Sequence, residues 1–349
     1  MESFYMTTRL LSIHDPQTDA RALEETVSIL KKGGLVGIPT ETVYGLAANA
    51  LDPVACTKIY QAKGRPADNP LIVHVDSLDM LKPLTTDFSP IAQALAVAFW
   101  PGPFTMILPK APCIPDVVTC SMPTVALRFP SHPVAHALIS ACGFPLAAPS
   151  ANRSGTPSPT TASHVMHDFD GVIDGVVECG QSAVGVESTV ITLCTPHPLL
   201  LRPGFVTLEE LRQVVPDIQV DPAVFVGVKE AEKVSSPGLK YKHYAPKAKV
   251  TILKGDSQAY AQFLQAHQQE RPVALCFEED LPLLTALPAV PYGSAVDSAS
   301  QAAALFSALR QLDEMGAARV YAHGPVETGI GMAVYNRLLR AAAFDVRTL

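Results

Sequence analysis

Short apolar runs alternate with segments of helical periodicity along most of this sequence, and this alternation constrains the fold more than any other feature. Residues 19–32 are predicted to form a helix, because Leu23, Val27 and Leu30 recur on one face and two glycines follow. The apolar run 35–38 that comes next is typical of a buried strand. Repeated helix–strand units of this kind predict an α/β fold.

The same pattern places further elements in the first two thirds of the chain. Asp52 and Pro53 predict the start of a helix that runs to Lys63 and Gly64, because aspartate caps helices and proline suits their first turn. A capping box predicts another short helix from Thr207. Further helices are predicted at 89–99 and 133–142, and further strands at 71–75, 105–108, 124–129, 145–148 and 188–193.

The alternation lapses between 216 and 246 and then resumes. Strands are predicted at 250–253, 273–277 and 319–322, and helices at 256–267, 298–315 and 333–343. These elements predict a second, smaller, Rossmann-like domain with three layers. We therefore expect a first domain, a linker and a second domain at 1–215, 216–247 and 248–349.

The composition fits a two-domain cytoplasmic protein. Of its 349 residues, 48% are hydrophobic, which is more apolar material than one core usually accommodates. Seven cysteines form no CxxC pair, which favours free thiols in a reducing compartment over a zinc site. No secretory leader and no apolar run of about 18 residues is present, so we expect no membrane span. With a net charge of −7, an anion site has to be built from a few placed cations.

Two polar clusters follow predicted elements, and the first of them lies at a strand end, where open α/β sheets bind ligands. The segment 39–46 (PTETVYGL) carries three hydroxyls and a carboxylate, although a polar turn with a helix cap explains it equally well. The segment 63–70 (KGRPADNP) holds Lys63 and Arg65 in a rigid Gly/Pro frame, where both cations can converge on a polyphosphate. Cations at a helix end also complement the helix dipole, so neither cluster is decisive by itself.

A third polar cluster, 149–155 (PSANRSG), follows an apolar strand and offers small hydroxyl and amide groups. Such groups suit a close approach to a nucleotide, but runs of this composition are also common in ordinary turns. The sequence contains neither GxxxxGK[ST] nor GxGxxG, so a Walker-type or dinucleotide-binding loop is excluded.

Together these segments closely resemble the YrdC-like family, in particular its two-domain threonylcarbamoyl-AMP synthases. The resemblance spans nearly the whole chain, in order, and its specificity comes from the number of motifs in register. The matching motifs are PTETVYGL (39–46), KGRPADNPLIVHV (63–75), WPGPFT (100–105), TVALRFP (124–130), APSANRSG (148–155), GVESTV (185–190), LRPG (201–204) and SPGLKYKHYAP (236–246).

The resemblance implies a fold and an activity. The implied fold is a twisted mixed sheet with helices around a basic cavity, plus the smaller Rossmann-like C-terminal domain. The implied reaction joins L-threonine, bicarbonate and ATP into threonylcarbamoyl-AMP and releases pyrophosphate. A downstream threonylcarbamoyl-transferase complex would then modify tRNA beside the anticodon. Mg²⁺ is expected with ATP, held mainly by phosphates and water, because no carboxylate cluster suggests a metal cage.

The resemblance also implies which residues form the site. Lys63 and Arg65 would be the catalytic cations on the nucleotide phosphates. The implied ATP-binding residues are Lys63, Arg65, Asn69, Thr124, Ser150, Asn152, Ser158, Arg202 and Tyr241. The implied L-threonine-binding residues are Thr42, His74, Arg128, Ala148 and Ser188, with Arg128 as the clamp for the substrate carboxylate.

Each assignment has a simpler alternative. His74 lies in an apolar strand and could be a core histidine, and Arg128 could form a surface ion pair. The segment 236–246 is predicted to act as a lid over bound ATP through Tyr241, or else as a stiff spacer with solvated lysines. For the whole chain, the alternatives are an RNA-binding module without catalysis, a carbamoyl-adenylate former for metallocentre maturation, and a scaffold whose second domain is the functional part.

Overall fold

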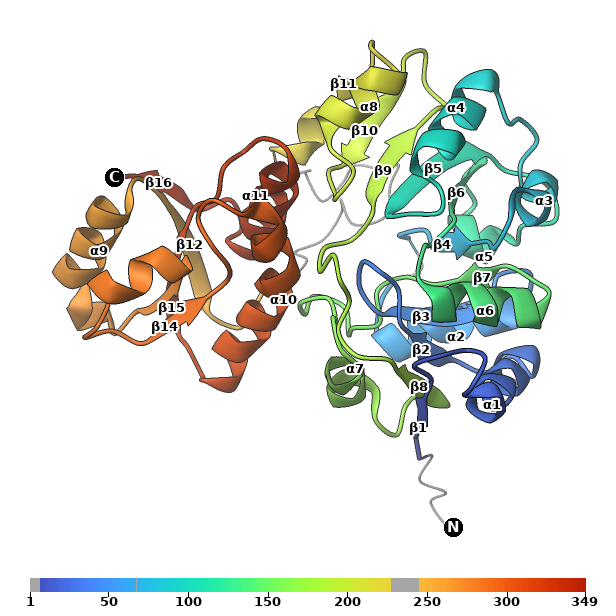
Figure 1. Cartoon of the computed structure of the whole chain (residues 1–349), viewed down its shortest axis with the longest axis horizontal. Coiled ribbons are helices and arrows are strands. Elements are labelled where there is room, and N and C mark those ends of the chain that lie inside the picture. The colour runs from blue at the N-terminus through green and yellow to red at the C-terminus, as the bar shows by residue number, and fades with distance from the viewer. Residues whose placement is uncertain (1–6, 67, 227–244) are drawn as a thin grey trace.

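The computed structural model describes residues 7–66, 68–226 and 245–349, which form two lobes (Figure 1). In the described part of the first lobe, eleven strands form one mixed sheet in the order β1-β8-β2-β3-β7-β4-β6-β5-β9-β10-β11. The strands are β1 (Arg9–Ser12), β2 (Val36–Ile38), β3 (Gly45–Asn49), β4 (Ile72–His74), β5 (Phe104–Pro109), β6 (Thr124–Arg128), β7 (Leu146–Ala147), β8 (Gly175–Glu178), β9 (Thr189–Thr192), β10 (Leu199–Arg202) and β11 (Gln219–Val220).

Helices surround this sheet, and local capping explains where several of them begin. In α2, the Asp52 side chain accepts hydrogen bonds from the backbone N–H groups of Val54 and Ala55, and left-handed Gly64 ends the helix. In α8, Thr207 and Glu210 form the predicted capping box. The helices of this lobe are α1 (Ala20–Lys31), α2 (Pro53–Lys63), α3 (Leu78–Leu81), α4 (Pro90–Phe99), α5 (Asp116–Thr119), α6 (Pro133–Cys142), α7 (Ala162–Phe169) and α8 (Leu208–Val214).

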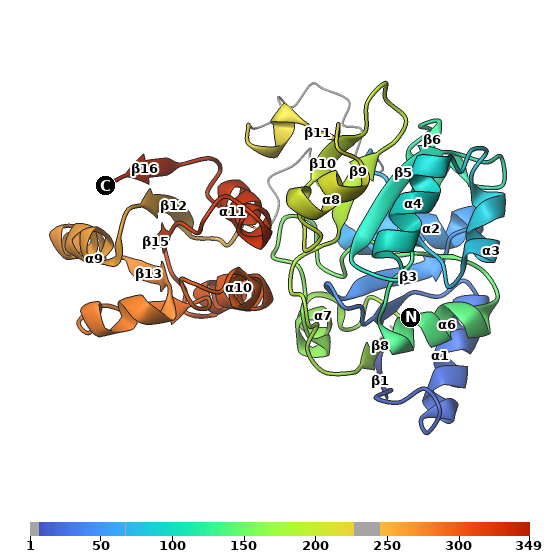
Figure 2. The ribbon, with the colours of Figure 1, turned by 45° about the horizontal axis from the view of Figure 1, so that its top comes forward.

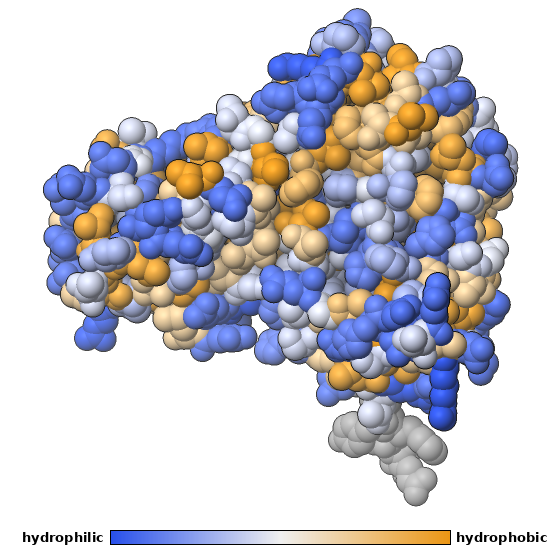
Figure 3. Space-filling model, viewed as in Figure 1, coloured by the Kyte–Doolittle hydropathy of each residue, from blue (hydrophilic) through white to orange (hydrophobic). Residues whose placement is uncertain are grey.

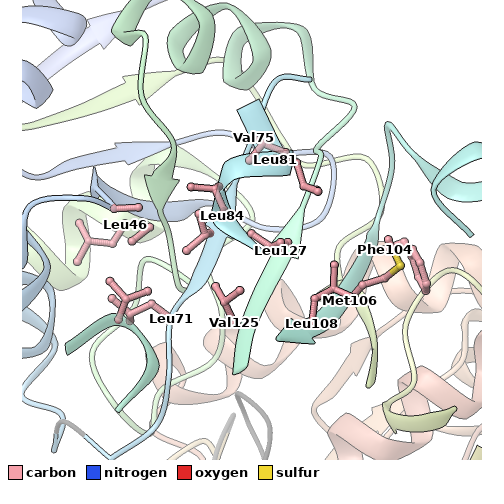
Figure 4. Close-up of a cluster of buried hydrophobic side chains, with 14 of the residues drawn as sticks. Leu46, Leu71, Val75, Leu81, Leu84, Phe104, Met106, Leu108, Val125 and Leu127 are labelled. Atoms are coloured by element: carbon pink, nitrogen blue, oxygen red, sulfur yellow. The ribbon is translucent and has the colours of Figure 1, made fainter. Parts of the chain in front are cut away.

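The main core of the first lobe lies against the centre of the sheet. Side chains of β3, β5 and β6 and of the residues on either side of β4 pack there with Leu81 of α3 and the nearby Leu84 (Figure 4). Burial of this cluster holds the central strands in register, and their ends carry the residues of the site described below. The labelled members are Leu46, Leu71, Val75, Leu81, Leu84, Phe104, Met106, Leu108, Val125 and Leu127.

The second lobe, residues 245–349, is a three-layer α/β unit. Its five strands are all parallel, in the order β14-β13-β15-β12-β16. One face of the sheet packs against α10 and α11, and the other packs against α9. The elements are β12 (Lys249–Lys254), α9 (Ser257–Ala266), β13 (Val273–Cys276), β14 (Ala289–Pro291), α10 (Ser298–Glu314), β15 (Arg319–His323), α11 (Ile330–Ala341) and β16 (Val346–Thr348).

The predicted fold class is confirmed, while several elements escape the sequence prediction. The predictions missed the strands β1, β3, β8, β10, β11, β14 and β16 and the helices α3, α5 and α7. The polar turn predicted at 39–46 instead leads directly into β3, which pairs antiparallel with β2. Because β11 pairs with β10, the first sheet extends beyond residue 215 to Val220. No helix in the described ranges is both long and apolar enough to span a membrane.

The two lobes meet along α10 and α11 (Figures 1 and 2), and hydrophobic residues gather where they join (Figure 3). Val43, Val184 and Val186 of the first lobe belong to the same buried cluster as the core of the second lobe. Gly185 lets α10 approach closely, since a Cβ there would lie 2.4 Å from the Ala302 carbonyl oxygen. The interface is therefore continuous with a hydrophobic core.

This contact generates a prediction for a matched pair of variants. Gly180 and Gly185 both have φ of +79°, but nothing lies within 4 Å of a Cβ built at Gly180. Gly180→Ala should cost about 1–2 kcal/mol, the strain of a left-handed alanine. Gly185→Ala should lower the unfolding midpoint considerably more, because α10 must also move. Thermal unfolding followed by circular dichroism measures both, and equal midpoints would contradict the close packing.

Candidate active site

A cavity of about 750 Å³, counting its open mouth, lies at the ends of β4, β6 and β10 beside the loops 39–43 and 149–155. It brings together ten of the residues predicted from the sequence, drawn from segments far apart in the chain. These are Thr42, Lys63, Arg65, His74, Arg128, Ala148, Ser150, Asn152, Ser188 and Arg202.

Three other described residues of the predicted site do not line this cavity. Thr124 is the first residue of β6 and pairs with Pro109. Asn69 is buried next to the Lys63–Arg65 segment, and its backbone oxygen accepts a hydrogen bond from Arg65 Nη2 at 2.7 Å. Ser158 is fully buried, and its hydroxyl donates to the carboxylate of Glu187, which does line the cavity. Tyr241 and most of the segment 236–246 lie outside the described residues.

Lys63 is buried at the C-terminal end of α2, with only 4% of its surface exposed. Its Nζ donates to the backbone oxygens of Ser150 and Asn152, at 2.5 and 2.7 Å. Burial, followed by the nearby Arg65 charge, lowers the pKa of this amine well below its ordinary value. Lys63 thus fixes the loop 149–152 and lines the cavity, where an anion would favour the protonated form of its amine.

Arg128 is held by the first polar motif. Its Nη1 donates to Thr42 Oγ1 at 2.9 Å, and its Nη2 lies 2.7 Å from a carboxylate oxygen of Glu41. Burial alone would raise the pKa of Glu41, but the Arg128 charge and the hydrogen bonds to the carboxylate together outweigh it, so the pKa is lowered. Arg128 therefore forms a buried ion pair rather than a surface one. Glu41 orients its guanidinium, which lines the cavity.

His74 is buried at the end of β4, where its Nδ1 lies 3.3 Å from the Ile72 carbonyl oxygen. Burial and then the Arg128 charge lower the pKa of its imidazole to about 3. The ring therefore stays neutral near pH 7. A neutral imidazole in this position can donate a hydrogen bond to a substrate hydroxyl or accept one from it, without adding another positive charge.

Elsewhere in the cavity lining, Arg202 holds Ser188. The Arg202 Nε donates to the Ser188 backbone oxygen at 3.0 Å, and Nη2 donates to Ser188 Oγ at 3.1 Å. Thr105 Oγ1 lies 2.8 Å from the same hydroxyl. These contacts fix Ser188 and bring the Arg202 guanidinium to the cavity wall.

Glu187 gives this wall a buried negative charge. Its Oε1 accepts from Ser158, and its Oε2 accepts from Nε of Arg337 in the second lobe at 2.8 Å. Burial would raise the pKa of Glu187, but the charges of Arg337 and then Arg202 outweigh it, so the pKa is lowered. The carboxylate is therefore ionised.

Glu41 and Glu187 had no role in the sequence prediction, and Arg337 was not singled out. Both glutamates stand as single acids inside otherwise apolar or hydroxyl-rich motifs (PTETV and GVESTV), which was the available signal. For Arg337 the sequence carries no such signal, because its partner Glu187 lies 150 residues away.

The arrangement suits the binding of anions rather than proton abstraction. Lys63, Arg65, Arg128 and Arg202 line one cavity, while both nearby carboxylates are compensated by arginines. Within the described ranges, no group of three or more His, Cys, Asp or Glu residues is placed to hold a metal ion.

Comparison with known proteins defines the class first. Residues 28–204 match the Sua5_yciO_yrdC family model, described as "Telomere recombination". Residues 206–343 match the Sua5_C model, described as "Threonylcarbamoyl-AMP synthase, C-terminal domain". The first lobe is thus a YrdC-like domain, joined to a second domain of the Sua5 type.

Full-length relatives define the family. Threonylcarbamoyl-AMP synthase of Bacillus subtilis is 43% identical over 345 residues, covering 97% of this chain and 96% of the relative. The Pyrococcus abyssi protein of the same name is 42% identical, with 91% and 93% covered. The crystal structure of P. abyssi Sua5 complexed with L-threonine superposes with a TM-score of 0.89 at 38% identity, over 98% of this chain and 99% of that one. The chain belongs to the threonylcarbamoyl-AMP synthase family.

The low pKa of His74 predicts how acid affects stability. As pH falls from 6.5 towards 3, the unfolded imidazole takes up a proton while the folded one stays neutral, so the free energy of unfolding decreases. The His74→Gln variant lacks this contribution. Between pH 7 and pH 5, its free energy of unfolding should therefore decrease by about 2 kcal/mol less than that of the wild type. Urea unfolding at the two pH values measures the difference.

The matched control for this measurement is His167→Gln, since His167 is exposed on α7. The free energy of unfolding of His167→Gln should change between pH 7 and pH 5 as much as that of the wild type. If His74→Gln also follows the wild type, the imidazole is not held neutral by the fold.

Proposed function

We propose that the protein forms L-threonylcarbamoyl-adenylate from L-threonine, bicarbonate and ATP, with release of pyrophosphate. The observation that carries the proposal is the convergence of Lys63, Arg65, Arg128 and Arg202 on one cavity in a chain of this family. The relative from P. abyssi was crystallised with L-threonine, which supports the amino acid as a substrate here. An RNA-binding role without catalysis is not favoured, because full-length relatives carry the synthase name.

We assign the two ends of the cavity to different substrates. Arg128, oriented by Glu41, would hold the threonine carboxylate, and neutral His74 with Thr42 and Ser188 would read its hydroxyl. Ala148 would contribute its backbone beside the amino acid. Lys63 and Arg65 would meet the phosphates from the α2 side, and Ser150, Asn152 and Arg202 would complete the nucleotide site.

The chemistry then needs alignment more than a strong base. The threonine amine captures carbon dioxide as a carbamate and gives up a proton. A carbamate oxygen, already anionic, attacks the α-phosphorus of ATP, and pyrophosphate leaves. Lys63 and Arg65 would offset the charge that develops on the phosphates, which is the catalytic role we assign to them. A phosphate-bound Mg²⁺ would add charge neutralisation there.

The product is a labile mixed anhydride, and a second enzyme has to use it. We propose that a threonylcarbamoyl-transferase complex consumes it to modify tRNA beside the anticodon. We place this work in the cytoplasm, because all seven cysteines are unpaired, as expected in a reducing compartment. Pyrophosphate release tests the whole proposal: it should require ATP, threonine and bicarbonate together, and release without threonine would contradict it.

Removing a phosphate-binding cation should lower activity without unfolding the protein. Arg65→Ala should raise the KM for ATP about 10- to 150-fold, because a lost charge-assisted hydrogen bond costs about 1.5–3 kcal/mol. Lys63→Ala should nearly abolish product formation, since it also releases the loop 149–152. The control is Lys58→Ala on the exposed side of α2, where Nζ donates to the Gly33 carbonyl oxygen. Wild-type kinetics in Arg65→Ala and Lys63→Ala would refute the assignment.

The hydroxyl-reading groups predict substrate selection. Valine should be rejected strongly, because it leaves the buried polar groups around Thr42, His74 and Ser188 without a partner. Serine should be disfavoured less, since a missing methyl group is worth only about 1–3 kcal/mol. Rates of pyrophosphate release with each amino acid give the comparison, and equal rates for threonine and valine would contradict the assignment.

A further inference from the structure

The second lobe inserts a buried cation into the wall of the substrate cavity. Arg337, on α11, has none of its surface exposed. Its Nε donates to Glu187 Oε2 at 2.8 Å, Nη1 donates to the Pro203 carbonyl oxygen at 2.8 Å, and Nη2 reaches the Glu187 backbone oxygen at 3.3 Å. One guanidinium therefore grips two motifs of the first lobe, GVESTV and LRPG.

Both gripped motifs carry cavity residues. Glu187 lines the cavity itself, and its neighbour Ser188 does too. Pro203 directly follows Arg202, another cavity residue. The other carboxylate oxygen of Glu187 accepts a hydrogen bond from Ser158. Hydrogen bonds thus connect Arg337 of the second lobe, through Glu187, to the loop beyond Gly155. A displacement of Arg337 would thus move several parts of the wall together.

Charge gives this contact its functional meaning. The charged groups that act on Glu187 are Arg337 from α11, Arg202 from β10 and Lys63 from α2. Arg202 and Lys63 are also cations that we assign to the nucleotide. Without Arg337, compensation of the buried carboxylate would fall to these two residues, and the carboxylate would compete with the phosphates for them.

We propose that Arg337 is a positioning residue for the nucleotide side of the cavity, so that the second domain completes the active site. It neutralises Glu187 and leaves the charges of Arg202 and Lys63 for the phosphates. The inference rests on the proposed function, because it takes ATP as the anion bound there. The second domain would then contribute to ATP binding, in addition to packing against the first lobe.

The test compares Arg337→Met with Arg340→Met. Arg340 lies on the same helix, its Nη2 donates to the Ala223 carbonyl oxygen at 3.2 Å, and it is not among the charges that shift the pKa of Glu187. Arg337→Met should raise the KM for ATP about tenfold or more, and the KM for threonine less than about threefold. Arg340→Met should leave both within about threefold. Arg337→Lys, which keeps the charge, should recover most of the ATP affinity.

A double-variant cycle separates charge compensation from simple packing. In the E187Q background there is no carboxylate charge to compensate, so adding Arg337→Met should change the KM for ATP by less than about threefold. An equal rise in the KM on both backgrounds would overturn the proposal. If Arg337→Met does not fold, as judged by circular dichroism, Arg337→Gln removes the charge with a polar side chain and gives the same comparison.

A pH profile adds a readout that a packing role would not move. In Arg337→Met, Glu187 loses its largest stabilising charge, so its pKa should rise, because burial then dominates. As pH increases through that raised pKa, the carboxylate ionises and competes for Arg202 and Lys63, so the KM for ATP should increase. The E187Q/R337M double variant should not show this increase, and a profile shared by both would overturn the proposal.

Calorimetric titration of the wild type with Mg·ATP distinguishes the two levels of failure. Wild-type protein that neither binds ATP nor forms the adenylate would overturn the proposed function and this inference together. Wild-type protein that does both, with Arg337→Met unchanged in ATP affinity, would overturn the inference alone.

Discussion

Repulsion between buried cations is the constraint on which the rest of this structure depends. Lys63, Arg65, Arg128 and Arg202 line one cavity, and like charges repel strongly where water is scarce. Different contacts offset the repulsion in different parts of the cavity. Two backbone oxygens hold the Lys63 amine, Glu41 pairs with Arg128, and Glu187 lies where Arg202 and Arg337 both act on it. The cavity can therefore remain positive without being forced apart.

These compensating contacts also explain why the loops of the first lobe lie where they do. The loop 149–152 is fixed through Lys63, and the loop 39–43 is fixed through Arg128. On the side of the second lobe, Arg310 holds Asp168 at 2.9 Å and donates to the Pro157 carbonyl oxygen at 2.7 Å. Two arginines of the second lobe thus support the loop 153–158 and the Glu187 wall. The interface and the site share the same contacts.

The sequence predicts the elements whose ends carry local signals. Helix α2 is the clearest case, because the Asp52 cap, Pro53 and Gly64 mark both of its ends. Strand β3 was missed, because its sequence, GLAAN, has neither β-branched nor aromatic residues to indicate a strand. Its position comes from pairing with β2 and β7, which is a tertiary effect.

The same distinction holds for the site. Ten of the implied residues line the cavity, and all ten belong to the family motifs. The sequence could predict these residues because the motifs could be recognised. Ser158 was implied as a nucleotide contact, whereas its hydroxyl bonds to Glu187 here. Glu41 and Arg337 act through partners far away in the chain, and no local pattern can report a contact that only the folded chain creates.

The proposed function requires one positive cavity to bring an amino-acid carbamate to the α-phosphorus of ATP. Mass spectrometry of a reaction run with ¹³C-bicarbonate, threonine and ATP tests it most directly. We expect an adenylate that contains threonine, AMP and one labelled carbon, and no product when bicarbonate and carbon dioxide are excluded. An adenylate formed without the labelled carbon, with threonine joined directly to AMP, would contradict it.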